Sequence, residues 1–192
     1  METLSWSTGR WTTPPVNAEL EGLDLLVTAA EGSDAWRFTS YGFVHDNEHA
    51  LVADFPQDSA MEVVFTAEFS EQFDQAGLFV VSGPECWVKA GVEFADGHAQ
   101  VGAVVTNPFS DWSVAPIDEW LGRRVRVRVS RSGDAITVRA GLDGEELRLV
   151  RVAPYPEDAA AEAGPLVCAP SRAGLTVRFH EWSRVPADGS LH

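Results

Sequence analysis

The stretch Arg124-Val125-Arg126-Val127-Arg128-Val129 alternates basic and apolar side chains without interruption. Because a β-strand sends successive side chains to opposite faces of a sheet, the three valines are expected to face a core and the three arginines to face outward. Alternation with a period of two is the main sequence signal of a strand. The stretch therefore predicts a strand with one buried face and one solvated face.

Apolar alternation of the same period, or a short apolar run, recurs over much of the chain. We predict further strands at Leu23–Ala29, Ala50–Phe55, Met61–Phe69, Ala76–Val81, Trp87–Phe94, Gln100–Thr106, Ala135–Ala140, Glu146–Val152 and Leu175–Trp182. Turn signals such as Asp96-Gly97 and Asp143-Gly144 separate several of them. Only Glu157–Ala163 has a helical pattern, which Gly164-Pro165 would end after one or two turns.

Many strands separated by Gly, Pro, Asn and Asp turns, with almost no helix, predict an all-β fold. Ala76–Val81 is apolar on both faces, which is typical of a strand in the middle of a sheet. We expect a two-sheet antiparallel β-sandwich of the jelly-roll type. The 192 residues fit one domain over residues 1–185, followed by a C-terminal tail, residues 186–192, that we expect to be disordered.

The composition limits the classes of partner. The chain has 14 basic and 29 acidic residues, a formal net charge of -15, and 45% hydrophobic residues. This balance argues against nucleic acids and anionic membrane surfaces, which attract basic patches. No apolar run approaches the roughly 18 residues of a membrane span, and Met1–Arg10 lacks the pattern of a signal peptide. With only Cys86 and Cys168, we expect a cytoplasmic protein with free thiols, either a monomer or a homodimer.

We expect neither a metal nor a cofactor. The five histidines lack zinc-ligand spacing, apart from His45 and His49 in a loop-like segment. The sequence has no glycine-rich phosphate loop before a helix and no nucleophile-elbow motif.

The clearest functional pattern lies in Cys86–Phe94, which contains Lys89, the only lysine of the sequence. As a strand, this stretch places Trp87, Lys89, Gly91 and Glu93 on one face and an apolar set that includes the cysteine on the other. The polar face predicts the floor of a pocket, and the alternative is an exposed surface of mixed charge. Lys89 and Glu93 lie roughly 13 Å apart along an extended strand, so we do not expect them to pair directly.

Lys89 and Glu93 each need a neighbour from another segment, and Asp74, Asp111 or Arg37 could supply it. Arg37 could instead bind a carboxylate or phosphate of a ligand. It lies in the polar and aromatic segment Asp34–His49. The alternative for that segment is a long loop held by its own hydrogen bonds.

Two further segments carry candidate side chains. Asp74 and Gln75 lie where a polar loop enters an apolar strand, a place where a sheet fixes side-chain position. Asp111 and Trp112 lie in a serine-flanked stretch after Pro108. The alternatives are a strand-initiating turn for the first pair and a capped turn with a hydrophobic plug for the second.

Several of these motifs occur in an order found in a known family. They are Trp36-Arg37-x-Thr39-x-Tyr41-Gly42-Phe43, Asp46-Asn47-x-His49, Asp74-Gln75-Ala76-Gly77-Leu78, Trp87-x-Lys89-x-Gly91-x-Glu93 and Ser110-Asp111-Trp112-Ser113. From about Trp11 to Trp182, the chain resembles the regulation-of-enolase-protein family, a domain of unknown function in the concanavalin A-like lectin/glucanase superfamily. The resemblance implies a two-sheet jelly roll whose concave face holds the polar motif residues. It suggests carbohydrate binding or cleavage at the superfamily level only.

We therefore expect a module that binds a small carbohydrate or a sugar acid. The expected ligand-binding residues are Trp36, Arg37, Tyr41, Asp46, His49, Gln75, Trp87, Lys89, Asp111 and Trp112. One alternative is a glycoside hydrolase or related sugar-active enzyme that uses Glu93 with Asp74 as its partner. The acidic strand motif usual in superfamily glucanases is absent, because Ala95 stands two residues after Glu93. A third hypothesis is a regulatory domain that binds a partner protein through this face.

Overall fold

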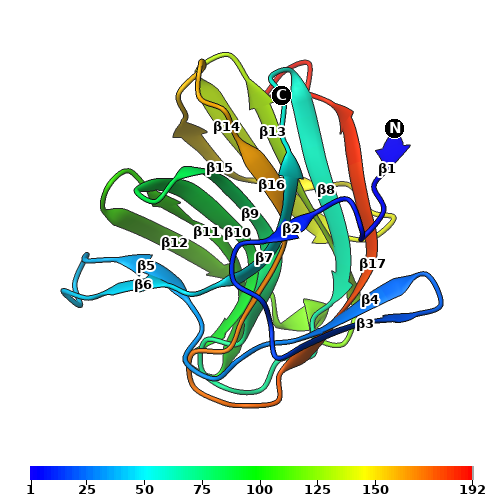
Figure 1. Ribbon diagram of the computed structural model, residues 1–192, viewed down its shortest axis with the longest axis vertical. Helices are drawn as coiled ribbons and strands as arrows, with labels where there is room; N and C mark the ends of the chain where they lie inside the picture. Colours follow the sequence, from blue (N-terminus) through cyan, green and yellow to red (C-terminus); the bar gives the residue numbers. More distant parts are fainter. Residues whose placement is uncertain (192) are drawn as a thin grey trace.

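The computed structural model describes residues 1–191, which form two antiparallel β-sheets packed face to face (Figure 1). The first sheet has seven strands in the order β12-β11-β10-β9-β16-β7-β2. Its strands are β2 (Arg10–Trp11), β7 (His49–Asp54), β9 (Gln75–Gly83), β10 (Cys86–Ala95), β11 (His98–Thr106), β12 (Ser110–Pro116) and β16 (Glu162–Cys168).

The second sheet has eight strands in the order β15-β14-β13-β8-β17-β4-β3, with β1 paired to β17. Its strands are β1 (Glu2–Thr3), β3 (Asn17–Glu21), β4 (Asp24–Thr28), β8 (Ser59–Thr66), β13 (Arg124–Ser132), β14 (Ala135–Leu142), β15 (Arg148–Pro154) and β17 (Thr176–Pro186). The hairpin of β5 (Ala35–Arg37) and β6 (Val44–Asp46) forms a small sheet of its own. The predicted all-β sandwich is confirmed.

The alternating stretch of residues 124–129 forms the first two thirds of β13, between β8 and β14. Its valines at positions 125, 127 and 129 are fully buried between the sheets, as predicted. On the outer face, the Arg126 guanidinium bonds to Glu62, Asp143 and Glu181. The period of two in β13 therefore places apolar side chains on the buried face and ion-paired side chains on the outer face.

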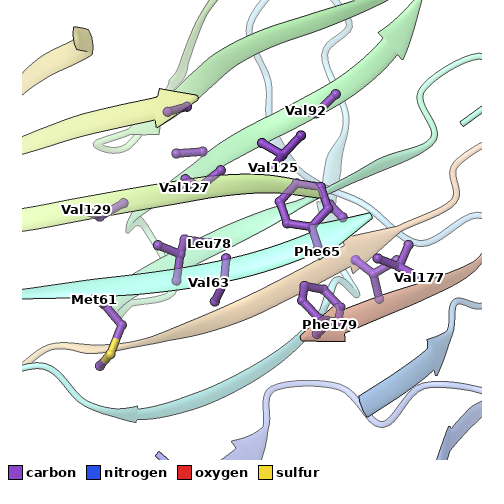
Figure 2. Packing of buried hydrophobic residues seen from close by; sticks show 14 of the residues in the cluster. Met61, Val63, Phe65, Leu78, Val92, Val125, Val127, Val129, Val177 and Phe179 are labelled. Atoms are coloured by element: carbon purple, nitrogen blue, oxygen red, sulfur yellow. The ribbon is translucent and has the colours of Figure 1, made fainter. Parts of the chain in front are cut away.

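The core between the sheets is built from alternate residues of facing strands. Figure 2 shows Phe65 of β8 close to Phe179 of β17, with Leu78 of β9 and Val92 of β10 contributed by the other sheet. The two phenylalanine rings lie 5.9 Å apart. Burying a side chain of this size stabilises the fold by roughly 1.5–3 kcal/mol, so this layer fixes the orientation of both sheets.

A row of glycines crosses the seven-stranded sheet, because Gly77, Gly91 and Gly102 are partners in register on β9, β10 and β11. A Cβ atom added to Gly91 would lie 2.1 Å from the carbonyl oxygen of Ala76. The glycine is required because the backbones approach closely here.

The predicted helix at Glu157–Ala163 is wrong. The segment contains turns and then enters β16 at Glu162. Seven residues are too few to stabilise a helix by local bonds alone. Ala163 is instead fully buried, on a strand that pairs with both β7 and β9.

The predicted disorder of the C-terminal tail is also wrong for the described residues. Pro186 is the last residue of β17, so the expected domain boundary at residue 185 falls inside a strand. Asp188 then bonds to Arg128 and Arg139 on the outer face of the eight-stranded sheet. His192 lies outside the described residues.

The helical content of residues 1–191 is one short 3-10 turn, η1 (Asp118–Trp120). No helix in this part of the chain has the length and apolar character to cross a membrane. Cys86 and Cys168 are both free thiols.

Candidate functional site

A cavity of about 300 Å³ lies on the face of the seven-stranded sheet that points away from the core. Strands β9 to β12 and the β5–β6 hairpin enclose it, and Figure 1 shows this hairpin beside β12, far from β8 and β17. The cavity is lined by Gly32, Asp34, Trp36, Tyr41, Phe43, His45, Phe73, Gln75, Lys89, Glu93, Val104, Trp112 and Pro170.

Strand parity on β10 places the polar floor of this cavity. Val88, Ala90 and Val92 belong to the core between the sheets. Lys89 and Glu93 point to the other face and line the cavity, as the sequence pattern predicted. A separate hollow of about 30 Å³, which shares Lys89 and Glu93 with the cavity, lies over Gly91 and Gly102.

Lys89 is paired with Asp34, a residue of the loop before β5. The ammonium lies 2.6 Å from Asp34 Oδ1, and only 5% of the Lys89 surface is exposed. Burial by itself disfavours the ammonium, but nearby negative charge, chiefly Asp34, outweighs burial and raises the pKa of Lys89. The lysine is therefore held in its charged form. None of the three partners suggested by the sequence contacts it.

Asp34 is itself held in place by backbone and amide groups. Its Oδ1 also accepts bonds from the Ala35 amide at 2.8 Å and the Gln75 side chain at 3.4 Å. Its own N–H donates to Asn47 Oδ1, and the Asn47 amide donates to the Gly32 carbonyl. Sequence reasoning noted Asp34 but did not choose it as a site residue. The available signal was a single buried lysine that required a carboxylate from another segment.

Glu93 is the least satisfied polar group of the cavity. Its Oε1 atom is buried and has no hydrogen-bond partner among the described residues. Burial raises the pKa of Glu93 to about 7 against the opposing effect of the Lys89 ammonium, and the carboxylates of Asp34 and Asp96 add to the rise. Glu93 can thus either donate or accept a hydrogen bond near neutral pH.

Aromatic side chains of the hairpin form one wall. The Tyr41 ring stacks on Phe43 at 5.3 Å and meets the edge of Trp36 at 5.6 Å. Trp36 donates from Nε1 to the Thr39 carbonyl, which fixes the plane of its indole. Trp112 of β12 lines the cavity as well and is 37% exposed. These rings offer flat apolar surfaces above a polar floor.

The hairpin is anchored to the sheet by its first strand. Trp36 packs into a second apolar cluster on this face, together with Ala35, Ala50, Val52, Phe79, Trp87, Val104, Leu166 and Cys168. The amide of Arg37 donates to Ser110 Oγ at 2.9 Å, and its guanidinium bonds to Glu85 at 2.6 Å. Arg37 does not line the cavity, and the contacts that it makes hold the hairpin against the sheet.

Trp87 is also placed differently from the prediction. It is only 5% exposed and packs 5.6 Å from the Phe79 ring inside the second apolar cluster. It does not line the cavity. Asp46 and Trp87 instead border a separate hollow near Arg10 and Glu162. Neither residue is brought together with Lys89 and Glu93.

Two other predicted residues have structural partners away from the cavity. Asp74 is completely buried and paired with Arg172 at 2.7 Å, so it is not the carboxylate partner of Glu93. Asp111 bonds to Arg151 at 2.9 Å, while its neighbour Trp112 points to the cavity, because adjacent strand residues face opposite ways.

His49 is a buried structural residue. Its Nε2 accepts a bond from the Ala30 amide, and its Nδ1 bonds to the Thr13 carbonyl, which requires a proton on Nδ1. Burial lowers the pKa of His49, so the neutral ring is favoured. Among residues 1–191, no group of three or more His, Cys, Asp and Glu side chains is arranged to hold a metal ion.

Residues 11–187 match the family model described as a protein of unknown function, DUF1349. The chain belongs to the DUF1349 family. It is 34% identical over 192 residues to Regulation of enolase protein 1 of Saccharomyces cerevisiae, covering 97% of this chain and 94% of that protein. The family resemblance predicted from the motifs is confirmed.

Two solved structures have a fold similar to that of this DUF1349 chain. A functionally unknown protein from Saccharomyces cerevisiae superposes with a TM-score of 0.90 at 33% identity, covering 97% of this chain and all of that one. Xylan beta-1,4-xylosidase from Bacillus halodurans C-125 superposes with a TM-score of 0.71 at 14% identity. That match covers 96% of this chain but only 39% of the xylosidase, and it shows likeness of fold alone.

Proposed function

We propose that the cavity binds a small carbohydrate. The observation that carries this proposal is the buried, unpartnered Oε1 of Glu93 on the floor of a cavity walled by aromatic rings. A buried polar atom without a partner costs roughly 1–3 kcal/mol, and a ligand hydroxyl would recover that free energy. Sugars combine hydroxyl groups with apolar ring faces, and both surfaces have a counterpart here.

The expected pose follows from the layout of the cavity. One face of a sugar ring lies against Trp112 or Tyr41, and the ring hydroxyls reach Glu93, Gln75 and Lys89. Ligand sites of this kind are mainly apolar with a few convergent polar groups. The volume of about 300 Å³ suits one or two sugar rings.

The test is isothermal titration calorimetry with a panel of neutral mono- and disaccharides. At least one sugar is expected to bind, and Trp112→Ala is expected to weaken it by about tenfold, because a stacking surface is lost. Asp111→Ala is the matched control, since its side chain pairs with Arg151 outside the cavity. Absence of any heat of binding or thermal shift over the whole panel would reject the proposal.

A second candidate is hydrolysis of a glycoside. It is favoured by a second carboxylate in the same cavity: Asp34 is paired with the Lys89 ammonium, whereas burial raises the pKa of Glu93 to about 7. Two carboxyl groups in such different surroundings can take different roles, one as a base or nucleophile and the other as a general acid. Asp34 thus replaces Asp74 as the proposed partner of Glu93. Turnover of chromogenic glycosides that Glu93→Gln abolishes would support this role, and turnover that survives would exclude it.

A further inference from the structure

The cavity contains one permanent cation, and a carboxylate of the protein already neutralises it. Lys89 lies 2.6 Å from Asp34, and its ammonium contacts no second acceptor among the described residues. Besides this pair, the ionisable side chains that line the cavity are Glu93, His45 and the phenol of Tyr41. With Asp96 also acting on Glu93, the floor is neutral to negative. The sequence analysis left both a neutral carbohydrate and a sugar acid open as ligands, and it did not include the Asp34 carboxylate beside Lys89.

Lys89 and Glu93 both have hydrogen-bonding capacity that the protein leaves unused. An ammonium carries three donors, and Asp34 takes one of them. Glu93 presents a buried oxygen without a partner on the same strand face. Lys89 thus offers donors and Glu93 offers an acceptor or a donor, depending on its proton. The separate hydroxyl groups of a sugar ring satisfy both side chains, because each hydroxyl can accept one bond and donate another.

A ligand carboxylate that reaches this floor can accept a bond from the lysine but cannot bond to ionised Glu93. It has no proton to donate to ionised Glu93, and two carboxylates that share one site disfavour each other's charge. The Asp34–Lys89 pair leaves no net positive charge to offset that repulsion. Ionised Glu93 therefore opposes an anionic ligand at this floor.

Resting on the proposed carbohydrate site, we propose that the cavity selects uncharged hydroxylated rings over their carboxylate counterparts, with Glu93 as the specificity-determining residue and Asp34 as the residue that cancels the lysine charge. The ligand class is thus neutral sugars and not sugar acids. The two carboxylates act by different routes, because Glu93 faces the ligand and Asp34 acts through Lys89.

The experiment compares matched pairs, glucose with glucuronate and galactose with galacturonate, by calorimetry at about pH 8, where Glu93 is mostly ionised. The wild-type protein is expected to bind the neutral sugar of a pair at least about tenfold more tightly than the uronate. Glu93→Gln keeps the size of the side chain and removes its charge, so the ratio is expected to fall below about threefold.

Asp34→Asn supplies the opposite arm. It leaves the Lys89 cation without its carboxylate, and the preference is expected to shift toward the uronate. Asp111→Asn changes the net charge by the same amount outside the cavity and is expected to leave the ratio unchanged. Circular dichroism establishes whether Asp34→Asn is folded. If it is not, Glu93→Gln still tests the proposal, because that substitution breaks no ion pair.

The outcomes separate this inference from the proposed function. A uronate that binds as tightly as its neutral sugar would overturn the charge selection while leaving carbohydrate binding intact. An equal change of ratio in Asp111→Asn and Glu93→Gln would also overturn it, because the general charge of the chain would then be the cause. If neither member of any pair binds and the whole panel of neutral sugars gives no heat of binding or thermal shift, both proposals fail.

Discussion

The Lys89 ammonium donates a 2.6 Å hydrogen bond to Asp34 Oδ1, although the two residues are 55 positions apart. This contact ties the loop before the β5–β6 hairpin to the middle of the seven-stranded sheet. It also decides the charge of the cavity floor, since it neutralises the only lysine. Lys89, which the sequence predicts as a ligand contact, therefore also joins two elements of the fold.

Lys89→Met is expected to lower the free energy of unfolding by about 2–4 kcal/mol, because it leaves the largely buried Asp34 carboxylate without its cation. In a double-mutant cycle with Asp34→Asn, the two losses are expected to be less than additive. Urea denaturation followed by tryptophan fluorescence measures both. Strictly additive losses would show that the pair contributes no coupling.

The stability of the protein is expected to depend on the ionisation of Glu93. The folded-state pKa is about 7, above the ordinary value of 4.5, so the folded protein keeps a proton that the unfolded chain has lost in this window. The free energy of unfolding therefore falls as the pH rises from about 4.5 to 7, by at most about 3 kcal/mol for this group. Lys89, Asp34 and Asp96 act on Glu93 and set the size of the effect.

Glu93→Gln removes this titration. Urea midpoints of the two proteins at about pH 5, 6, 7 and 8 give the difference curve, which cancels the titration of other groups such as His49 and His180. The variant is expected to gain stability relative to the wild-type protein as the pH increases. A difference that is constant over this range would exclude a raised pKa of Glu93.

Substitutions of Trp87, which precedes Lys89 in the chain, and of Trp112, which follows it, are expected to have different effects on stability. Trp87→Ala empties a buried site and is expected to cost about 3–5 kcal/mol of stability. Trp112→Ala removes a partly exposed wall of the cavity and is expected to change stability by less than about 1 kcal/mol. Thermal unfolding of the two variants compares them. A Trp112→Ala variant as unstable as Trp87→Ala would mean that Trp112 is part of the core.

Gly91→Ala is expected to destabilise the protein by about 2 kcal/mol or more, because the new methyl group meets the Ala76 carbonyl at 2.1 Å. Gly83→Ala, on the same sheet, is the matched control: no atom lies within 4 Å of its added Cβ, and it is expected to be neutral or slightly stabilising. Melting temperatures distinguish them. Equal temperatures would show that the glycine row can relax.

The C-terminal residues are expected to contribute to stability through Asp188. Asp188→Ala removes ion pairs with Arg128 and Arg139 on a partly buried face and is expected to cost about 1–2 kcal/mol. Asp111→Ala, which removes an exposed ion pair, is expected to cost less than about 0.5 kcal/mol. Urea denaturation is the measurement, and equal losses would contradict the bonded tail.

Most of the fold was predictable because each sheet packs one face into the core, which leaves a period of two in the sequence. The alternation in β13 and the parity of β10 identified core and outer faces, and turn signals such as Asp96-Gly97 located the hairpins. The three-residue strands β5 and β6 and the edge strand β12 were missed. Each pairs over few residues or lies at an edge, so tertiary contacts decide it more than local pattern does.

The candidate site was predictable in part. The face that holds Lys89 and Glu93 follows from strand parity, which is a local property, and Gln75 was chosen from its place where a loop enters a strand. The roles of Asp74 and His49 did not follow, because both side chains are satisfied by partners from distant segments: Arg172 for the first, Ala30 and Thr13 for the second.

The sequence by itself determined the family, the two-sheet architecture and the sides of β10 on which its residues lie. Only the tertiary structure decided that Asp34 neutralises Lys89, that Trp87 is buried and that Glu93 keeps an unpartnered oxygen. The physical reason is the range of the interactions. Alternation depends on the chain's own geometry, whereas a charge and its partner meet only when separate segments pack together.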